Sequence, residues 1–434
     1  MANALKRQAG AVHRGNIVPP GGVTPNVVGG VVAGGMIMPD TVQLQELADL
    51  FMENSEQNYL MMNRVPLTPG ATEQFNLQTV GLGEGLELLV SGTFNIRNAH
   101  TAVQVVALPP DFPYNLLRGV TIIFNGQATL VQASGYELLA MMLKRHIKSN
   151  FIRSAGGPAA LDGRIASVSV TGGTLVAGAP SLTGFTGISI AAGAVATITI
   201  RFYLDISFVL RKDLLLGLLP MANTSVHANV QLMVSPLVGT SPEFPINSSG
   251  LTLITAEVPV LTCQPTYKFW GLPAQRQLYE HLVNTSYIVT KYANLPITTT
   301  GERAIAFEVP INFWLVSALM VVRNAGRTLV DVFSTLDRAH LVYNGTIMVD
   351  MSDMVTRVAR DFVHQGFEMP LGQLLFDYTQ TGNLWSNSGN TSRWLNMYQA
   401  SNPMLHANVA TGVTVPGTFD VVLERIAPNH VQVI

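Results

Sequence analysis

The stretch Leu116–His146, LLRGVTIIFNGQATLVQASGYELLAMMLKRH, contains in order the patterns of a strand, a tight turn, a second strand and a helix. The first apolar run ends in an aromatic residue followed by Asn125-Gly126. Asn-Gly is the strongest short hairpin signal, because both residues tolerate a positive φ. Ser134 then opens a helical pattern that ends in basic residues, as helix caps and the helix dipole favour. We therefore expect a hairpin followed by a helix.

The same plan recurs in Leu336–His364, LDRAHLVYNGTIMVDMSDMVTRVARDFVH. Its hairpin signal is Asn344-Gly345, and Ser352 opens its helical pattern. One recurrence of a short motif is weak, since a chain of this length repeats roughly one tetrapeptide by chance. Several features that recur in one order are stronger, because they indicate a module used twice.

Two further features follow in that order. An Asp lies inside an aromatic strand in each half, at Asp205 in FYLDIS and at Asp377 in LLFDYT. Each half then reaches the tetrapeptide HANV, which begins at His227 and at His406. The shared order of hairpin, helix, Asp strand and HANV strand predicts one β-module present in two copies. From Gln74 onward, short β-branched runs bounded by Gly, Pro and Asn predict an all-β sandwich or barrel.

Residues 1–65 are expected to form an N-terminal arm and a helix. Residues 1–38 are rich in Gly, Pro and Val, which is typical of an arm that orders only against a partner. The helix is expected over PDTVQLQELADLFMENSEQNYLMM, capped by Asp40 with Gln43 as its capping-box partner. We expect the apolar side of this helix to pack on the domain or on a neighbouring subunit.

Two segments suggest the domain boundaries. The Gly/Ala-rich segment 154–194 is expected to be a long inserted loop that is either functional or an interface element. The stretch LTCQPTYKFWGLPAQRQ, Leu261–Gln277, is expected to link the two halves. These features give a first module over residues 66–262 and a second over residues 263–434.

The composition favours a structural protein that is largely covered by partners. Charged residues make up 12% of the 434 residues and apolar residues 48%, and the charged share is about half of the usual one. No apolar run approaches the ~18 residues that span a bilayer. The net charge of −2 argues against broad, direct contact with nucleic acid. The first residues lack the apolar core of a signal peptide, so we expect no secretory leader.

No catalytic, cofactor-binding or metal-binding residue is expected. A double-barrel, cupin-like metal enzyme or a lectin is the alternative, but His227 and His406 lack the His-x-His spacing that such an enzyme would use. Asp205 and Asp377 are interpreted as backbone-bonded residues in a bend rather than paired acids. The lone Cys263 has no local activating base. A spike or vertex protein is a third alternative, although this chain has no repetitive shaft.

The segments FPYNLLRGVTIIFNGQATLVQASGYELL (Phe112–Leu139) and FVLRKDLLLGLLPMANTSVHANVQLMV (Phe208–Val234) resemble one known family. It comprises the major capsid proteins of tailless icosahedral viruses with an internal membrane, the tectivirus-type double jelly-roll proteins related in fold to the adenovirus hexon. The resemblance implies two tandem eight-stranded jelly rolls, each with a short helix after a hairpin.

The resemblance also implies partners and a place in the virion. A homotrimer would form a pseudo-hexagonal capsomer that contacts neighbouring capsomers and other virion proteins, in a shell over a membrane. Lys6, Arg7 and Arg14 of the basic arm would then contact lipid headgroups or neighbouring trimers. No cofactor is implied.

Overall fold

A computed structural model of the chain describes its main elements. The residues described are 31–33, 36–38, 41–145, 152–153, 160–210, 215–241, 244–247, 254–274, 280–283, 285–307, 313–324, 328–330, 332–351, 369–377, 395–397, 400–410 and 417–428. The arm residues Lys6, Arg7 and Arg14, the cap Asp40 and the second helical pattern from Ser352 lie outside these residues. Within the described part, no helix combines the length and the hydropathy needed to cross a membrane.

The second half of the chain contains an eight-stranded roll. Its strands are β20 (Thr285–Ile297), β21 (Gly301–Ala306), β22 (Trp314–Arg323), β23 (Leu336–Tyr343), β24 (Thr346–Met351), β25 (Gln373–Asp377), β27 (Met404–Val409) and β28 (Gly417–Pro428). They form two sheets, with orders β25-β22-β28-β20 and β21-β27-β23-β24. Numbered along the roll, these orders are 6-3-8-1 and 2-7-4-5. This is the jelly-roll arrangement of two facing antiparallel sheets.

The first half repeats that arrangement. Its eight strands are β3 (Gln57–Met61), β5 (Thr72–Asn76), β6 (Leu82–Asn98), β8 (Leu117–Phe124), β9 (Ala128–Ala133), β15 (Val195–Ser207), β16 (Ala228–Val234) and β19 (Ile254–Trp270). Their sheet orders, β15-β6-β19-β3 and β9-β8-β16-β5, are again 6-3-8-1 and 5-4-7-2. The expected all-β fold of two tandem jelly rolls is therefore confirmed.

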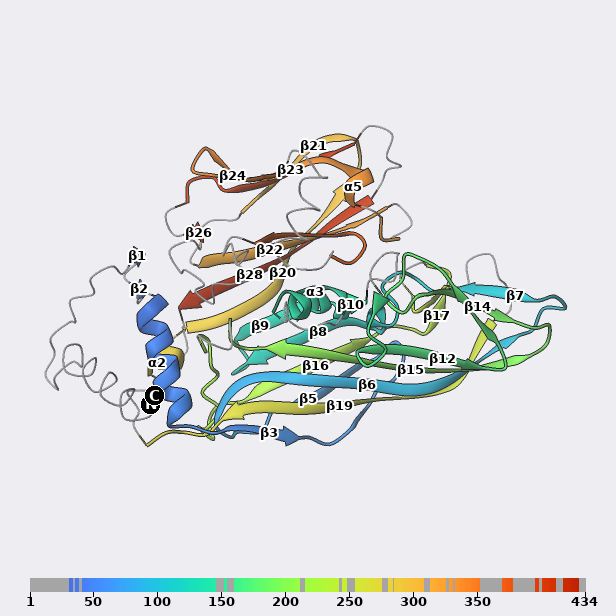
Figure 1. Cartoon of the computed structure of the whole chain (residues 1–434), viewed down its shortest axis with the longest axis horizontal. Helices are drawn as coiled ribbons and strands as arrows, with labels where there is room; N and C mark the ends of the chain where they lie inside the picture. Colours follow the sequence, from blue (N-terminus) through green and yellow to red (C-terminus); the bar gives the residue numbers. More distant parts are fainter. Residues whose placement is uncertain are drawn as a thin grey trace, which may run out of the picture.

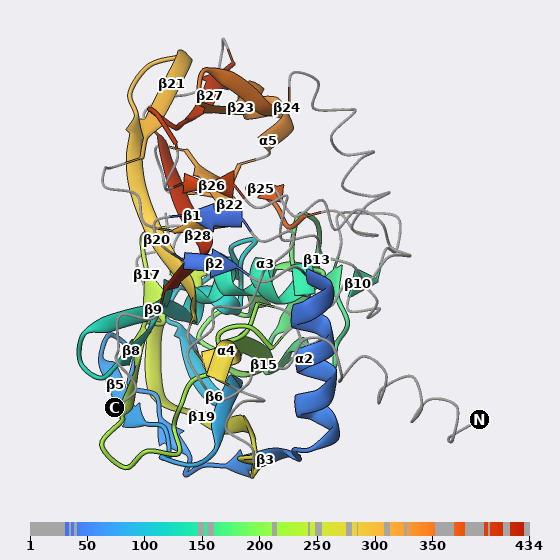
Figure 2. The same ribbon diagram turned by 90° about the vertical axis from the view of Figure 1, so that its left-hand side faces the viewer.

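The two rolls lie side by side and share one sheet (Figures 1 and 2). Strand β20 of the second roll pairs in parallel with β9 of the first, at Val289↔Val131 and Thr290↔Gln132. The resulting 9-stranded sheet runs through both rolls. Helix α3 (Gly135–Arg145) follows β9, and its buried residues belong to a core that also includes Trp314 and Ile426 of the second roll. The helix after the hairpin is thus packed where the two rolls meet.

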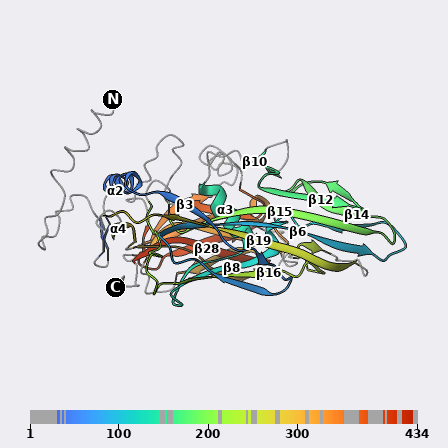
Figure 3. The same cartoon turned by 90° about the horizontal axis from the view of Figure 1, so that it is seen from below.

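The N-terminal helix is shorter than expected. Helix α2 spans Thr41–Glu53, and the residues that follow form β3 instead of continuing the helix to residue 62. Its Phe51 ring meets the Trp270 ring edge-on, with centroids 5.6 Å apart. Helix α2 lies at one end of the molecule, opposite the end that carries β14 (Phe185–Ile190) (Figures 1 and 3). Inside the expected arm, β1 (Val31–Ala33) pairs with β2 (Met36–Met38).

Two expectations about segments are wrong. Leu261–Trp270 is no linker, because it forms the last part of β19, which pairs with β6 and β3. This strand also crosses the expected boundary between residues 262 and 263. In its described residues, 160–194, the insertion is largely folded rather than an open loop, since β12 (Ala166–Thr171) extends the β15 edge and β14 (Phe185–Ile190) pairs with β7 (Gln104–Ala107).

The remaining elements are short. They are β4 (Val65–Pro66), η1 (Tyr114–Leu116), β10 (Ile152–Arg153), β11 (Ala160–Leu161), β13 (Thr174–Ala177), β17 (Val238–Gly239), β18 (Ile246–Asn247), α4 (Glu280–Val283), α5 (Val332–Thr335) and β26 (Leu395–Asn396).

Candidate functional site

The two Asn-Gly turns occupy the same place in each roll. Asn125-Gly126 joins β8 to β9 and Asn344-Gly345 joins β23 to β24. The asparagines have φ values of 51° and 52°, and the glycines have values of 66° and 73°. Each asparagine side chain also accepts a hydrogen bond from a backbone N–H that leads into the seventh strand. The donors are His227 for Asn125, at 3.0 Å, and Ser401 for Asn344, at 2.6 Å.

The two HANV tetrapeptides occur at the seventh strand of each roll but at different positions: the first begins one residue before β16 and the second lies inside β27. Phe124, just before the first turn, pairs with Ala228, so His227 precedes β16. In the second roll His406 lies inside β27 and pairs with His340. The strand is repeated, whereas the position of the tetrapeptide within the strand is not.

Asp205 and Asp377 lie on the sixth strands, β15 and β25, and each is paired with a buried lysine. Lys268 on β19 lies 2.5 Å from Asp205 (Nζ to Oδ1). Lys144 on α3 lies 3.6 Å from Asp377 (Nζ to Oδ1). Our interpretation as backbone-bonded residues in a bend missed these lysines, because each lies far from its partner in the sequence. The two aspartates therefore neutralise buried cations.

Lys144 belongs to a buried polar cluster between the rolls. It donates a hydrogen bond to Glu424 on β28, and the Ser317 hydroxyl donates to the same carboxylate at 2.5 Å. The Tyr287 hydroxyl donates to Glu424 at 2.5 Å and accepts from the Arg145 guanidinium at 2.5 Å. Lys144 and Arg145 come from the first roll, and their partners come from the second. Charged hydrogen bonds of this kind fix the orientation of the two surfaces.

The electrostatics of the cluster favour its charged form. Burial by itself raises the pKa of Glu424, but the charges of Lys144 and Arg145 outweigh it and lower that pKa to about 2. For Lys144, burial lowers the pKa, but the two carboxylates outweigh it and the net pKa is raised. Both groups are therefore ionised at neutral pH, as a paired buried lysine and glutamate require.

A second set of polar contacts joins the rolls nearby. Arg323 on β22 donates to Asp111 of the first roll at 3.2 Å. The Tyr136 hydroxyl on α3 donates to the Leu371 carbonyl at 2.6 Å, and the Gln373 amide returns a bond to the Tyr136 carbonyl at 3.0 Å. Helix α3 is thus attached to the second roll near both of its ends.

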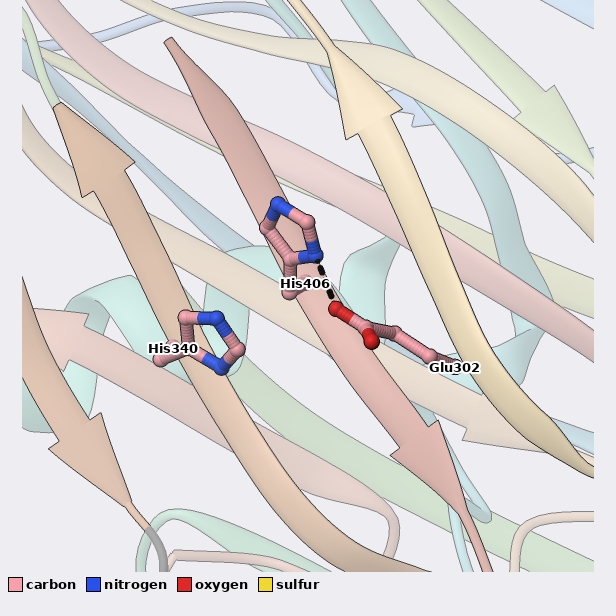
Figure 4. Close-up of side chains that lie close together, drawn as sticks. All are labelled: Glu302, His340 and His406. Carbon is pink, nitrogen blue, oxygen red and sulfur yellow. Dashed lines mark hydrogen bonds and ion pairs between the residues drawn. The ribbon is translucent and has the colours of Figure 1, made fainter. Parts of the chain in front are cut away.

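The outer face of the second roll carries a cluster that the sequence did not predict. Glu302 on β21, His340 on β23 and His406 on β27 have ligand atoms that lie within 4.8 Å of one another (Figure 4). The first roll has Thr121 and Gln231 at the matching cross-strand pair. The cluster combines residues far apart in the sequence, so no local motif signals it.

The cluster does not resemble the site of a barrel enzyme. Leu405, Ala407 and Val409 of β27 are buried in the core of the second roll, so the alternating His406 faces outward. Ligands of a site inside the barrel would point the opposite way. Cys263 is no candidate nucleophile either, because burial raises its pKa to about 12.

Comparisons with known proteins show which solved structures share this fold. No family model and no curated protein matches the chain. The crystal structure of the STIV major capsid protein superposes with a TM-score of 0.57 at 11% identity, covering 87% of this chain and 100% of that chain. A chain of the atomic structure of Sulfolobus Turreted Icosahedral Virus gives a TM-score of 0.54 at 12% identity, covering 87% and 92%. A chain of the PBCV-1 virus capsid gives 0.50 at 11% identity, covering 86% and 95%. The chain therefore has the double jelly-roll fold found in the major capsid proteins of icosahedral viruses.

Proposed function

We propose that the chain is a structural major capsid protein whose homotrimers form pseudo-hexagonal capsomers in an icosahedral virion shell over an internal membrane. The observation that carries this proposal is the pair of rolls with identical strand order, which lie side by side and share one sheet. Three such chains around one axis present six similar rolls, which gives a unit of nearly six-fold outline. Such a unit tiles a closed shell with neighbouring capsomers and other virion proteins.

The similar structures support this role. They are a virus major capsid protein, a virion structure and a virus capsid, and each is covered almost completely by this chain. The match therefore extends over both rolls. Because identity is 11–12%, it is the architecture that carries over to this chain.

The surface of the first roll also suits assembly. Strand β3 ends its sheet and exposes Tyr59 by 58% and Met61 by 71%. On neighbouring β19, Val260 is exposed by 63%. An apolar edge strand is a template for unwanted pairing unless a neighbour covers it. We assign this edge to contact between copies of the chain.

We assign the basic arm to contact with the membrane or with neighbouring trimers. Lys6, Arg7 and Arg14 are well placed by charge to bind anionic headgroups or to contact neighbouring trimers. The low net charge of the whole chain suits a shell that a membrane separates from the genome. Deletion of residues 1–15 tests the assignment, because unchanged particle yield and membrane retention would contradict it.

The mass of the purified, untagged protein tests the capsomer proposal. Light scattering after gel filtration should give about three times the chain mass of 46.7 kDa. A matched variant, Met61→Glu, places a charge on the exposed edge and should shift the population toward monomer while leaving the fold intact. A stable monomer for the unmodified chain under assembly conditions would contradict the trimer.

A further inference from the structure

The Glu302, His340 and His406 cluster is built by the register of three adjacent strands. His340 and His406 are direct cross-strand partners on β23 and β27. Glu302 on β21 pairs with Asn408, which places it diagonally from His406. Direct cross-strand neighbours have Cβ atoms about 5 Å apart, and long side chains also reach diagonal neighbours. The sheet therefore brings all three side chains to one spot.

The side chains are already close. The His406 Nδ1 atom lies 2.6 Å from the Glu302 Oε1 atom. The imidazole rings of His340 and His406 are stacked, with centroids 4.7 Å apart and planes 9° from parallel. In Figure 4 the Glu302 carboxylate lies on one side of the His406 ring, and the His340 ring lies on the other side.

We propose that these three side chains bind a divalent transition-metal ion of the zinc class. Two imidazoles and one carboxylate are a ligand set that Zn²⁺ accepts, with a fourth position left for water. The site is separate from the contacts between the rolls and goes beyond the capsid role. It is specific to the second roll, since Thr121 and Gln231 occupy the matching pair in the first.

The distances allow an ion with small side-chain movements. Zinc–ligand distances of about 2.0–2.2 Å in a tetrahedron place ligand atoms roughly 3.3 Å apart. The 2.6 Å contact between Glu302 and His406 would open slightly, and the wider separations within the 4.8 Å limit would close. Rotation of the imidazoles about their side-chain bonds achieves both, while the strands hold the Cα atoms in place.

The three side chains differ in exposure, and this difference gives an ion a path into the site. His340 is 8% exposed, whereas the Glu302 side chain is 61% exposed and that of His406 16%. An ion would meet the exposed carboxylate first and then the two rings. Once bound, it ties β21, β27 and β23 together on the outer face of their sheet and so stabilises that sheet.

Zinc titration of the full chain tests the site. The protein is purified without a histidine tag, stripped with a chelator and titrated with Zn²⁺ by calorimetry, and Co²⁺ is used as a spectroscopic probe. We expect one ion per chain with micromolar or tighter affinity, and a visible Co²⁺ spectrum of low coordination number. Loss of the direct ligand in His406→Ala should weaken binding by roughly 100-fold or more.

Two further variants make the result specific. Glu302→Gln changes an exposed residue that folding tolerates, and it should weaken binding by roughly 10-fold or more. His227→Ala removes the histidine of the other HANV tetrapeptide and should leave binding unchanged. Unchanged affinity in both His406→Ala and Glu302→Gln, or no binding by the unmodified chain, would overturn the proposal. The trimer mass is measured on the same samples, so the metal site and the capsomer are tested separately.

Discussion

Removal of the Lys144 charge should destabilise the protein more than removal of any surface lysine. In Lys144→Met, the Glu424 carboxylate stays buried at 1% exposure with its strongest partner gone. Breaking one side of a buried ion pair typically costs 3–5 kcal/mol. Ser317 and Tyr287 still donate to Glu424, so we expect the low end, a loss of about 3 kcal/mol.

The direction of the Glu424 pKa shift supports this expectation. The charges of Lys144 and Arg145 outweigh the effect of burial and lower that pKa to about 2, so the folded protein favours the ionised, paired form. The pair between α3 and β28 is therefore expected to be a principal contact between the rolls.

Urea unfolding at neutral pH measures this loss, and Lys291→Met is the matched control. Lys291 lies 2.5 Å from the buried Asp420, but the Lys291 side chain is 38% exposed, and the Asn294 amide still donates to Asp420 when Lys291 is replaced. A pair screened by water in this way should contribute under about 1 kcal/mol. Equal losses for the two variants, or a loss below about 1 kcal/mol for Lys144→Met, would refute our reasoning about the contact between the rolls.

Three other outcomes follow from the same structure. Because the pKa of Glu424 is lowered in the folded state, its contribution to stability is fully present above pH 4.5 and is lost as the pH falls toward 2. Unfolding followed by circular dichroism should therefore show a steep loss of stability between these pH values. In Lys144→Met this pH dependence should be weaker. Asn344→Ala places alanine, whose side chain cannot form a hydrogen bond, at a φ of 52° and should lower the free energy of unfolding by about 1–2 kcal/mol. Asn344→Gly should lower it by less, because glycine adopts this φ without strain. Thermal melts measure both losses, and equal losses would contradict a role for the backbone angle. Cys263 is buried with a pKa raised to about 12, so a thiol reagent should label it only after unfolding, and fast labelling of the native protein would contradict its burial.

The local part of the fold could be predicted from the sequence. The Asn-Gly turns, the apolar strands beside them and the helix after the first hairpin depend on residues adjacent in the chain. The repeated order of these features was enough to indicate two similar modules. The HANV tetrapeptide supported that conclusion for a partly wrong reason, because its two copies lie at different positions on equivalent strands.

The features that sequence reasoning missed depend on contacts between distant residues. The Pro- and Gly-flanked stretch after Leu261 suggested a linker, yet pairing with β6 makes it a strand through Trp270. The helix expected to reach residue 62 ends at Glu53, because the next residues gain backbone partners on β19. Only the strand register brings Glu302 to His406, and a lone histidine gives no sign of it.

Images of the purified protein by electron microscopy test the central claim most directly. Class averages viewed down the particle axis should show a compact, nearly hexagonal outline made of six lobes, two from each of three chains. Averages that show isolated two-lobed particles, or rings with a number of lobes other than six, would contradict a trimeric capsomer built from paired jelly rolls.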